Sequence, residues 1–287
     1  MRLLAILLAL CTATLDANGA LSEAIQKRIA ASDADVAVAL RTLDGQIELL
    51  IQPDVPFHAA STMKVPVMIE LFRQAAEGLI PLDTPIAVRN EFHSIVDGSV
   101  YKLSEGDDSD VDVYAKVGET MTPRQLCEAM ITVSSNLAAN ILIEKLGAEN
   151  IQRTVHAMGA DGMKVLRGVE DDKAFEKGLN NATTARSLLV MLTKIAQGEA
   201  VSPIASRAMA DMLSRQRFRD GIPAQLPEGT RVAHKTGNIT KIHHDAAIVY
   251  GPRPFVLVVL VRGIEDQKVS GPLIAAIART AYDAIAP

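Results

Sequence analysis

The chain has 287 residues, of which 48% are hydrophobic and 22% charged, and its formal net charge is -5. This length allows one large domain or two intertwined ones, and the hydrophobic share is enough for a substantial core. The negative charge, the 3% aromatic content and the lack of any Lys/Arg run exclude a typical nucleic-acid-binding surface.

Residues 1–19 are predicted to be a secretory signal peptide. Arg2 supplies a positive start, a short apolar run follows, and Ala17-Asn18-Gly19 offers small residues for cleavage. The alternative is that these residues form the first turns of a buried helix. The apolar run is too short to span a bilayer, and no later segment is long and apolar enough. We therefore expect an exported protein, periplasmic or secreted, without a stable membrane span.

The two cysteines give no internal disulfide in an exported chain. Cys11 lies in the predicted signal peptide, so cleavage would leave only Cys127. Alternatively, Cys11 could carry a lipid anchor, although Leu10 before it is bulkier than such sites usually tolerate.

Hydrophobic periodicity predicts strands near both ends of the chain and helices between them. Asp44-Gly45 is a strong hairpin signal between two alternating segments. The predicted strands are Asp35–Leu43, Gln46–Ile51, Arg231–Thr236, Ala246–Tyr250 and Phe255–Val261. The predicted helices are Leu21–Ala31, Ser61–Ala76, Pro123–Ile131, Leu137–Leu146, Asn150–Met158, a segment capped by Thr183 or Thr184 that runs to Gln197, Ser202–Gln216 and Ile274–Ile285.

This order of elements predicts an α+β fold. Segments 20–60 and 217–287 would form an α/β domain, in which terminal helices flank one antiparallel sheet. Residues 61–216 would form an inserted, mostly helical domain. A site is expected in the cleft between the sheet edge and the helical domain.

Residues 91–119 form a polar, irregular excursion with an acidic run from Glu105 to Asp112. A solvated surface segment explains this composition best. A calcium loop is the alternative, but the run lacks regular ligand spacing. The excursion lies between two of the motifs described next, so it could edge the substrate cleft.

Four short motifs follow one another in a fixed order. They are Ser61-Thr62-Met63-Lys64, Ser134-Ser135-Asn136, Glu176-Lys177-Gly178-Leu179-Asn180 and Lys235-Thr236-Gly237. Residues three apart share a helix face, so the first motif sets an amine beside a hydroxyl. A serine hydroxyl is a weak nucleophile until a neighbouring base takes its proton. Each motif alone is most often structural, but together they indicate an active site that acylates a serine.

The motifs S-x-x-K, S-x-N and K-T-G resemble those of class A β-lactamases and penicillin-binding proteins. The E-x-x-L-N element resembles the class A branch, and the resemblance covers the chain from about Leu21 onwards. It implies the α+β fold given above, with Ser61 as the nucleophile and Lys64 as base or proton relay. Ser134 would pass a proton to the leaving nitrogen, although the family more often has Asp where Ser135 stands.

The remaining roles are also implied by this resemblance. Glu176, held by Asn180, would activate the deacylating water. Glu170 is the rival residue, because Ala174 and Phe175 stand where the family usually has an Arg before the glutamate. The expected substrate-binding residues are Asn136, Asn180, Lys235, Thr236, Gly237, Asn238 and His244. The backbone N–H groups of Ser61 and Asn238 would form the oxyanion hole.

His244 occupies the position at which many class A enzymes carry an Arg for the substrate carboxylate. A histidine is only partly charged at neutral pH, which puts the substrate range and the rate in question. The run His243-His244-Asp245 was also considered as a metal site, but no other His or Cys has convincing spacing.

The sequence therefore predicts an exported serine hydrolase that opens a β-lactam amide through an acyl-Ser61 intermediate, with no metal and no organic cofactor. Its partner would be a small-molecule β-lactam or a peptidoglycan-derived peptide, and we expect a monomer. A D,D-peptidase acting on peptidoglycan peptides is the alternative enzyme. A penicillin-binding or sensor module that is acylated without turnover is the alternative from another class.

Overall fold

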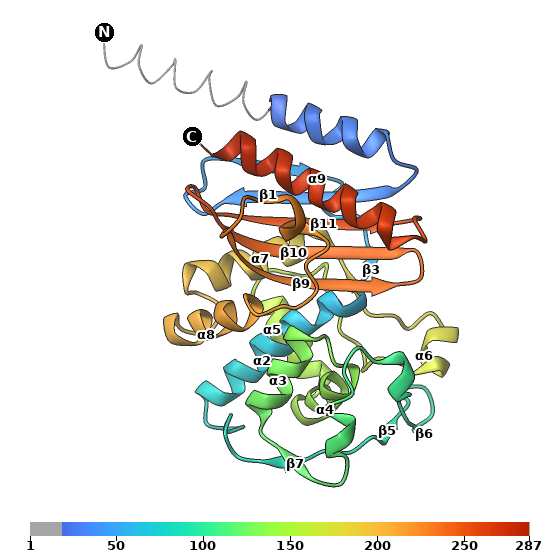
Figure 1. The fold of residues 1–287 in the computed structure, drawn as a ribbon. Helices are drawn as coiled ribbons and strands as arrows, with labels where there is room; N and C mark the ends of the chain where they lie inside the picture. Colours follow the sequence, from blue (N-terminus) through green and yellow to red (C-terminus); the bar gives the residue numbers. More distant parts are fainter. Residues whose placement is uncertain (1–18, 287) are drawn as a thin grey trace.

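The computed structural model describes residues 19–286. Its centre is a five-stranded antiparallel sheet with the strand order β2-β1-β11-β10-β9 (Figure 1). The strands are β1 (Asp35–Thr42), β2 (Glu48–Ile51), β9 (Arg231–Ile239), β10 (Ile242–Tyr250) and β11 (Phe255–Arg262). Both ends of the chain therefore contribute to one sheet, and β9 lies at its edge. This confirms the predicted α+β class.

Two helices from the chain ends cover one face of this sheet. A helix at residues 19–30 lies beside α9 (Gln267–Ile285), and Arg28 Nε donates a hydrogen bond to Thr280 Oγ1 at 2.7 Å (Figure 1). Side chains alternate across a strand, so Val36 and Val38 pack under these helices while Ala37 faces the opposite way. The alternating pattern of β1 thus serves two apolar cores.

The other helices lie on the opposite side of the sheet, where α2 runs through their centre (Figure 1). They are α2 (Lys64–Ala76), α3 (Pro123–Thr132), α4 (Asn136–Leu146), α5 (Ala148–Ala157), α6 (Asp172–Glu176), α7 (Ala185–Gln197) and α8 (Pro203–Leu213). Helix α2 is buried on nearly all sides, as expected of a helix without a continuous polar face. One continuous apolar core joins these helices to the sheet, so the division into two domains stays a prediction.

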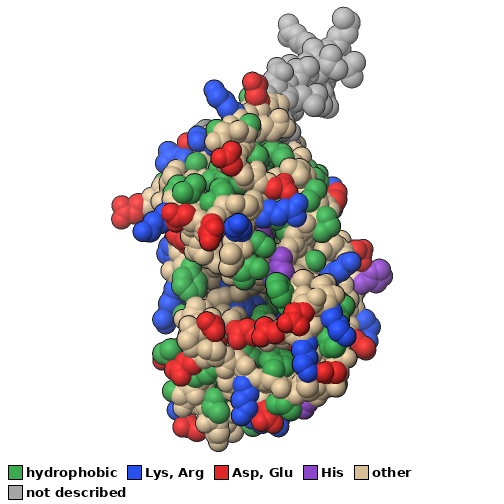
Figure 2. Space-filling model, turned by 90° about the vertical axis from the view of Figure 1, so that its right-hand side faces the viewer, with side chains coloured by type: hydrophobic (Ala, Val, Ile, Leu, Met, Phe, Trp, Pro, Cys, Tyr) green, Lys and Arg blue, Asp and Glu red, His purple; other side chains and the backbone are tan. Residues whose placement is uncertain are grey.

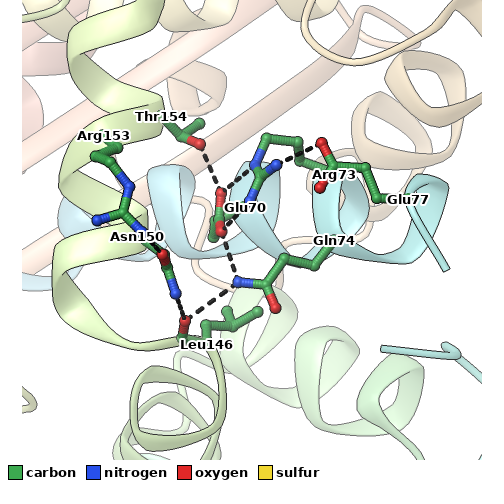
Figure 3. Close-up of polar contacts among 8 residues, drawn as sticks. All are labelled: Glu70, Arg73, Gln74, Glu77, Leu146, Asn150, Arg153 and Thr154. Atoms are coloured by element: carbon green, nitrogen blue, oxygen red, sulfur yellow. Dashed lines mark hydrogen bonds and ion pairs between the residues drawn. The ribbon is translucent and has the colours of Figure 1, made fainter. Parts of the chain in front are cut away.

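A buried carboxylate fixes α2 to α5 (Figure 3). Glu70 accepts hydrogen bonds from Arg73 Nε at 2.7 Å, Gln74 Nε2 at 2.6 Å and Thr154 Oγ1 at 2.5 Å. Burial alone would raise the pKa of Glu70, but these hydrogen bonds lower it below its ordinary value. Helix α2, which begins at the lysine of the S-x-x-K motif, is therefore held by an ionised group with several partners.

Short elements connect the sheet and the helices. The two-residue strands pair as β3 (Phe57–His58) with β8 (Ala182–Thr183), β4 (Ile86–Ala87) with β7 (Thr120–Met121) and β5 (Phe92–His93) with β6 (Val100–Tyr101). The 3₁₀ turns are η1 (Ala60–Met63), η2 (Glu105–Asp107), η3 (Tyr114–Lys116) and η4 (Ile222–Gln225). The acidic excursion is irregular, as predicted. None of the helices in the described part of the chain has the length and apolar character needed to cross a membrane.

Most predicted helix starts are confirmed by their caps. Thr122 and Gln125 form a reciprocal capping box before Pro123, and Thr184 caps α7. Two starts differ from the prediction by four residues or more. Helix α9 begins at Gln267, capped by Asp266, and β10 begins at Ile242 rather than Ala246. The polar residues at the start of β10 are buried strand residues whose side chains find partners within the fold.

Candidate active site

A cleft of about 540 Å³ lies between the free edge of β9 and the start of α4. Its wall includes residues from four of the segments singled out in the sequence, and Figure 2 shows a hollow on one face with a row of acidic side chains along its edge. The residues that line the cleft are Ser61, Asp107, Ser109, Ser134, Asn136, Arg217, Phe218, Arg219, Asp220, Thr236, Asn238 and Gln267. Three of the four motifs are thus brought together.

Ser61 lies in η1, directly against β9. A Cβ atom on Gly237 would stand 3.2 Å from Ser61 N and 3.2 Å from Thr62 N, closer than nearly all Cβ contacts in proteins. Only glycine lets the strand approach the backbone N–H of Ser61 this closely. Ala60, just before the serine, has φ 44°, a strained conformation for a residue with a side chain.

Lys64 is completely buried beneath the cleft. Its Nζ donates to the Ser134 carbonyl oxygen at 2.5 Å and to Asn136 Oδ1 at 2.8 Å, and lies 3.2 Å from Ser134 Oγ. Burial lowers the pKa of Lys64 to about 7, against the raising effect of the nearby carboxylates Asp108 and Glu170. At neutral pH, Lys64 therefore has a substantial neutral fraction that can accept a proton.

Ser134 joins the two lysines of the site. Lys235 Nζ donates to Ser134 Oγ at 3.0 Å and to the Thr236 carbonyl at 2.9 Å. Burial, and then the charge of Lys64, lowers the pKa of Lys235 well below its ordinary value. Ser134 has φ 62°, which is uncommon for a residue other than glycine and points its carbonyl and hydroxyl toward the lysines.

Asn136 links Lys64 to a carboxylate. Its Oδ1 accepts from Lys64, while its Nδ2 donates to Glu170 Oε1 at 3.0 Å. Glu170 is half-buried, and burial raises the pKa of its carboxyl group. Glu170 also has φ 61°, so residues with strained backbones border the site at three positions.

The structure does not bring Glu176 to the site. Glu176 is exposed at the end of α6, and Phe175 before it is exposed as well. The side chain of Asn180 makes a hydrogen bond within the loop: its Oδ1 accepts from Arg167 Nη2 at 3.1 Å. Arg167 also donates from Nε to the Leu179 carbonyl at 2.9 Å, which closes the loop that carries Glu170.

His244, expected to contact a substrate carboxylate, is not among the residues that line the cleft. His244 is completely buried; its Nε2 donates to the His58 carbonyl at 3.0 Å, and its Nδ1 accepts from Val261 N at 3.1 Å. Burial lowers the pKa of His244 to about 4, so the ring is neutral at neutral pH. Both ring nitrogens are satisfied by backbone groups, and His244 acts as a structural residue between β10 and its neighbours.

The other predicted binding residues lie along β9. Thr236 and Asn238 line the cleft, while Lys235 is buried behind them. Within the described chain β9 pairs only with β10, so its outer edge, which borders the cleft, has no neighbouring strand. An extended acyl substrate can pair with such an edge.

No group of three or more His, Cys, Asp or Glu residues with metal-binding geometry occurs within residues 19–286. His243 instead contacts Ser270 Oγ through Nδ1 at 2.8 Å. Cys127 is a free, buried thiol. The predicted signal peptide and Cys11 lie outside the described residues, apart from Gly19.

Sequence reasoning missed two residues at this site. Arg167 stands three residues before Glu170. If Glu170 rather than Glu176 is taken as the general base, the expected Arg is therefore present, and this spacing could have identified Glu170 from the sequence. Asp108 contacts the backbone of Asn136 and lies near Lys64, but it was read only as part of an acidic run. No local pattern distinguished it from the carboxylates around it.

Comparison with known proteins gives consistent matches over the whole fold. Residues 20–285 match the model of the Beta-lactamase enzyme family. The chain is 25% identical over 275 residues to the extended-spectrum beta-lactamase PER-1 of Pseudomonas aeruginosa, covering 91% of this chain and 86% of that protein. It is 30% identical over 165 residues to a beta-lactamase of Streptomyces lavendulae, covering 54% of this chain, and this match spans only about half (53%) of that relative. A solved structure described as an ancestral class A beta-lactamase superposes with a TM-score of 0.80 at 26% identity, over 92% of this chain and 99% of that one.

Proposed function

Because the chain belongs to the Beta-lactamase enzyme family, we propose that it is a serine β-lactamase that opens the lactam amide through an acyl-Ser61 intermediate. The observation that carries this proposal is the convergence of two buried lysines on Ser134, beside the nucleophile. Glu170, reached through Asn136, supplies the group that acyl-enzyme hydrolysis requires.

Acylation uses the neutral form of Lys64. Lys64 takes the Ser61 proton as Ser61 Oγ attacks the lactam carbonyl, and the proton then reaches the leaving nitrogen through Ser134. Lys235 favours this relay because the hydrogen bond from its Nζ holds Ser134 Oγ in place. The developing oxyanion is stabilised by the N–H groups of Ser61 and Asn238, an arrangement supported by the close contact at Gly237.

Deacylation uses Glu170 as the general base for a water molecule. Its position beside Asn136 and its half-buried setting support this role. Burial raises the pKa of Glu170 toward the working range, which makes its carboxylate a stronger base than an exposed glutamate. Glu176 is exposed on α6 and is not among the residues that line the cleft, which favours Glu170 over Glu176 for this role.

Lys235, Thr236 and Asn136 would bind the polar groups of the substrate. Since His244 is buried and neutral, Arg217 and Arg219 are the exposed cations that line the cleft and can attract a carboxylate. We further propose that the chain is exported and acts as a monomer, with a β-lactam or a peptidoglycan-derived peptide as its small-molecule partner. Antibiotic resistance would follow only from lactam hydrolysis at an adequate rate.

The test is mass spectrometry of the purified mature chain with benzylpenicillin, combined with a chromogenic cephalosporin assay. We expect a transient adduct of one penicilloyl group and steady hydrolysis, both absent in Ser61→Ala. A lasting adduct without turnover would indicate a penicillin-binding or sensor module. No adduct, with activity on D-Ala-D-Ala peptides, would indicate a peptidase.

A further inference from the structure

Asp108 contacts the start of helix α4 from outside that helix. Its carboxylate accepts the N–H of Asn136 at 3.0 Å (Oδ1) and 2.9 Å (Oδ2), and the N–H of Leu137 at 3.0 Å (Oδ2). These are the first two backbone donors of α4, which an α-helix leaves without partners of its own. Asp108 belongs to the acidic excursion and lies 28 residues before Asn136 in the chain.

The residue that caps α4 within the motif is uncharged. The hydroxyl of Ser135 accepts a hydrogen bond from the backbone N–H of Ala138, the third residue of α4. An aspartate is the commoner residue at this place in the S-x-N motif, and a carboxylate there would add negative charge at the helix N-terminus. In this chain, that negative charge comes from Asp108.

The backbone held by Asp108 carries the polar centre of the site. Ser134 has φ 62°, and its carbonyl and hydroxyl face Lys64. The side chain of Asn136 bridges Lys64 and Glu170. A strained turn keeps such a conformation only where surrounding contacts fix it. Asp108 holds the backbone N–H groups of Asn136 and Leu137, which follow this turn at the start of α4.

We propose that Asp108 is a positioning residue for serine acylation, holding the Ser134-Ser135-Asn136 turn in the conformation that brings Ser134 and Asn136 to Lys64. This inference rests on the proposed function. The S-x-N motif of this chain has no carboxylate at the N-terminus of α4. Asp108, from the acidic excursion, supplies that carboxylate instead.

The charge of Asp108 also acts on Lys64. The charged groups that face Lys64 are Lys235 from β9, Glu170 from the loop before α6, and Asp108 from the excursion. Asp108 is the stronger of the two carboxylates that raise the pKa of Lys64. Removing its charge therefore lowers the pKa of Lys64, and more of this lysine is neutral at acidic pH.

The experiment compares four variants with the wild type: Asp108→Asn, Asp108→Ala, the double variant Asp108→Ala/Ser135→Asp, and Asp112→Asn. Asp112 is an exposed carboxylate of the same excursion, so its variant is a control with the same change of charge. The acylation rate constant for benzylpenicillin is measured from pH 5 to 9 by quench-flow mass spectrometry. Circular dichroism and thermal melting establish that each variant is folded.

We expect both single Asp108 variants to acylate about tenfold to a hundredfold more slowly at pH 8, since small misplacements of reacting groups have effects of this size. The acid limb of their profile should move to lower pH. The double variant should regain most of the rate because its carboxylate is restored from within the motif. Asp112→Asn should match the wild type.

Folded Asp108 variants that acylate like Asp112→Asn, with an unmoved acid limb, would overturn this inference alone. A slow Asp108→Ala that Ser135→Asp does not improve would also overturn it, because the carboxylate would then not be the group that matters. A wild type that forms no adduct would overturn the proposed function, and this inference with it.

Discussion

The close approach of β9 to Ser61, the proposed nucleophile, can be tested by adding a single methyl group. In Gly237→Ala, the new Cβ would lie 3.1 Å from Thr62 Cγ2 and 3.2 Å from the backbone nitrogens of Ser61 and Thr62. All three distances are shorter than ordinary van der Waals contact, and two involve backbone atoms, which cannot rotate away. We expect η1 to move from β9 by a few tenths of an ångström, which widens the oxyanion hole.

The expected loss of acylation rate follows from the displacement of one hydrogen-bond donor of the proposed oxyanion hole. Losing a whole oxyanion donor costs about 3 kcal/mol of transition-state stabilisation. A displaced donor keeps part of its interaction, so we expect a loss of about 1.4–2.7 kcal/mol, or roughly tenfold to a hundredfold in the acylation rate. Binding of substrate before acylation should change less.

The assay is the presteady-state acylation rate with benzylpenicillin, together with the melting temperature. Gly106→Ala is the matched control, since its Cβ would meet only Ser104 Oγ at 3.7 Å, an ordinary contact. A folded Gly237→Ala protein that acylates as fast as Gly106→Ala would refute the proposed proximity of β9 to the oxyanion.

Three other predictions concern stability and reactivity. Glu70→Gln should lower the free energy of unfolding, measured by urea titration, by about 2 kcal/mol at pH 7. Because folding lowers the pKa of Glu70, this difference between wild type and variant should shrink as pH falls below about 4.5. Burial lowers the pKa of His244 to about 4 in the folded protein, so the wild type should lose stability as pH falls from about 6.5 to 4. The same titration of His244→Asn should show a smaller loss. Burial raises the pKa of the Cys127 thiol, so it should react with iodoacetamide only after unfolding, which intact mass spectrometry would detect.

Local patterns were sufficient for most of the fold. Alternation in Asp35–Thr42, the turn signal at Asp44-Gly45 and the caps at Thr122 and Thr184 each describe an interaction within a few residues. Such interactions can be read from a short window of sequence. The motifs around Ser61, Ser134 and Lys235 were also found, because each is a short segment with fixed spacing.

The features that were missed depend on contacts between distant segments. The E-x-x-L-N pattern selects Glu176, but the path of the loop depends on Arg167 and its bonds to Leu179 and Asn180. His244 lies opposite Gly237 in the sheet. Its ring nonetheless bonds to the carbonyl of a residue 186 positions away, which no sequence window contains.

The central claim is that Ser61 is acylated and that Glu170 then drives hydrolysis. The most direct measurement is time-resolved mass spectrometry of Glu170→Gln and Glu176→Gln with benzylpenicillin. We expect Glu170→Gln to accumulate the acyl-enzyme and release it about a hundredfold to ten-thousandfold more slowly than wild type, as for loss of a general base. Glu176→Gln should turn over normally. Accumulation in Glu176→Gln, with normal turnover in Glu170→Gln, would contradict the account.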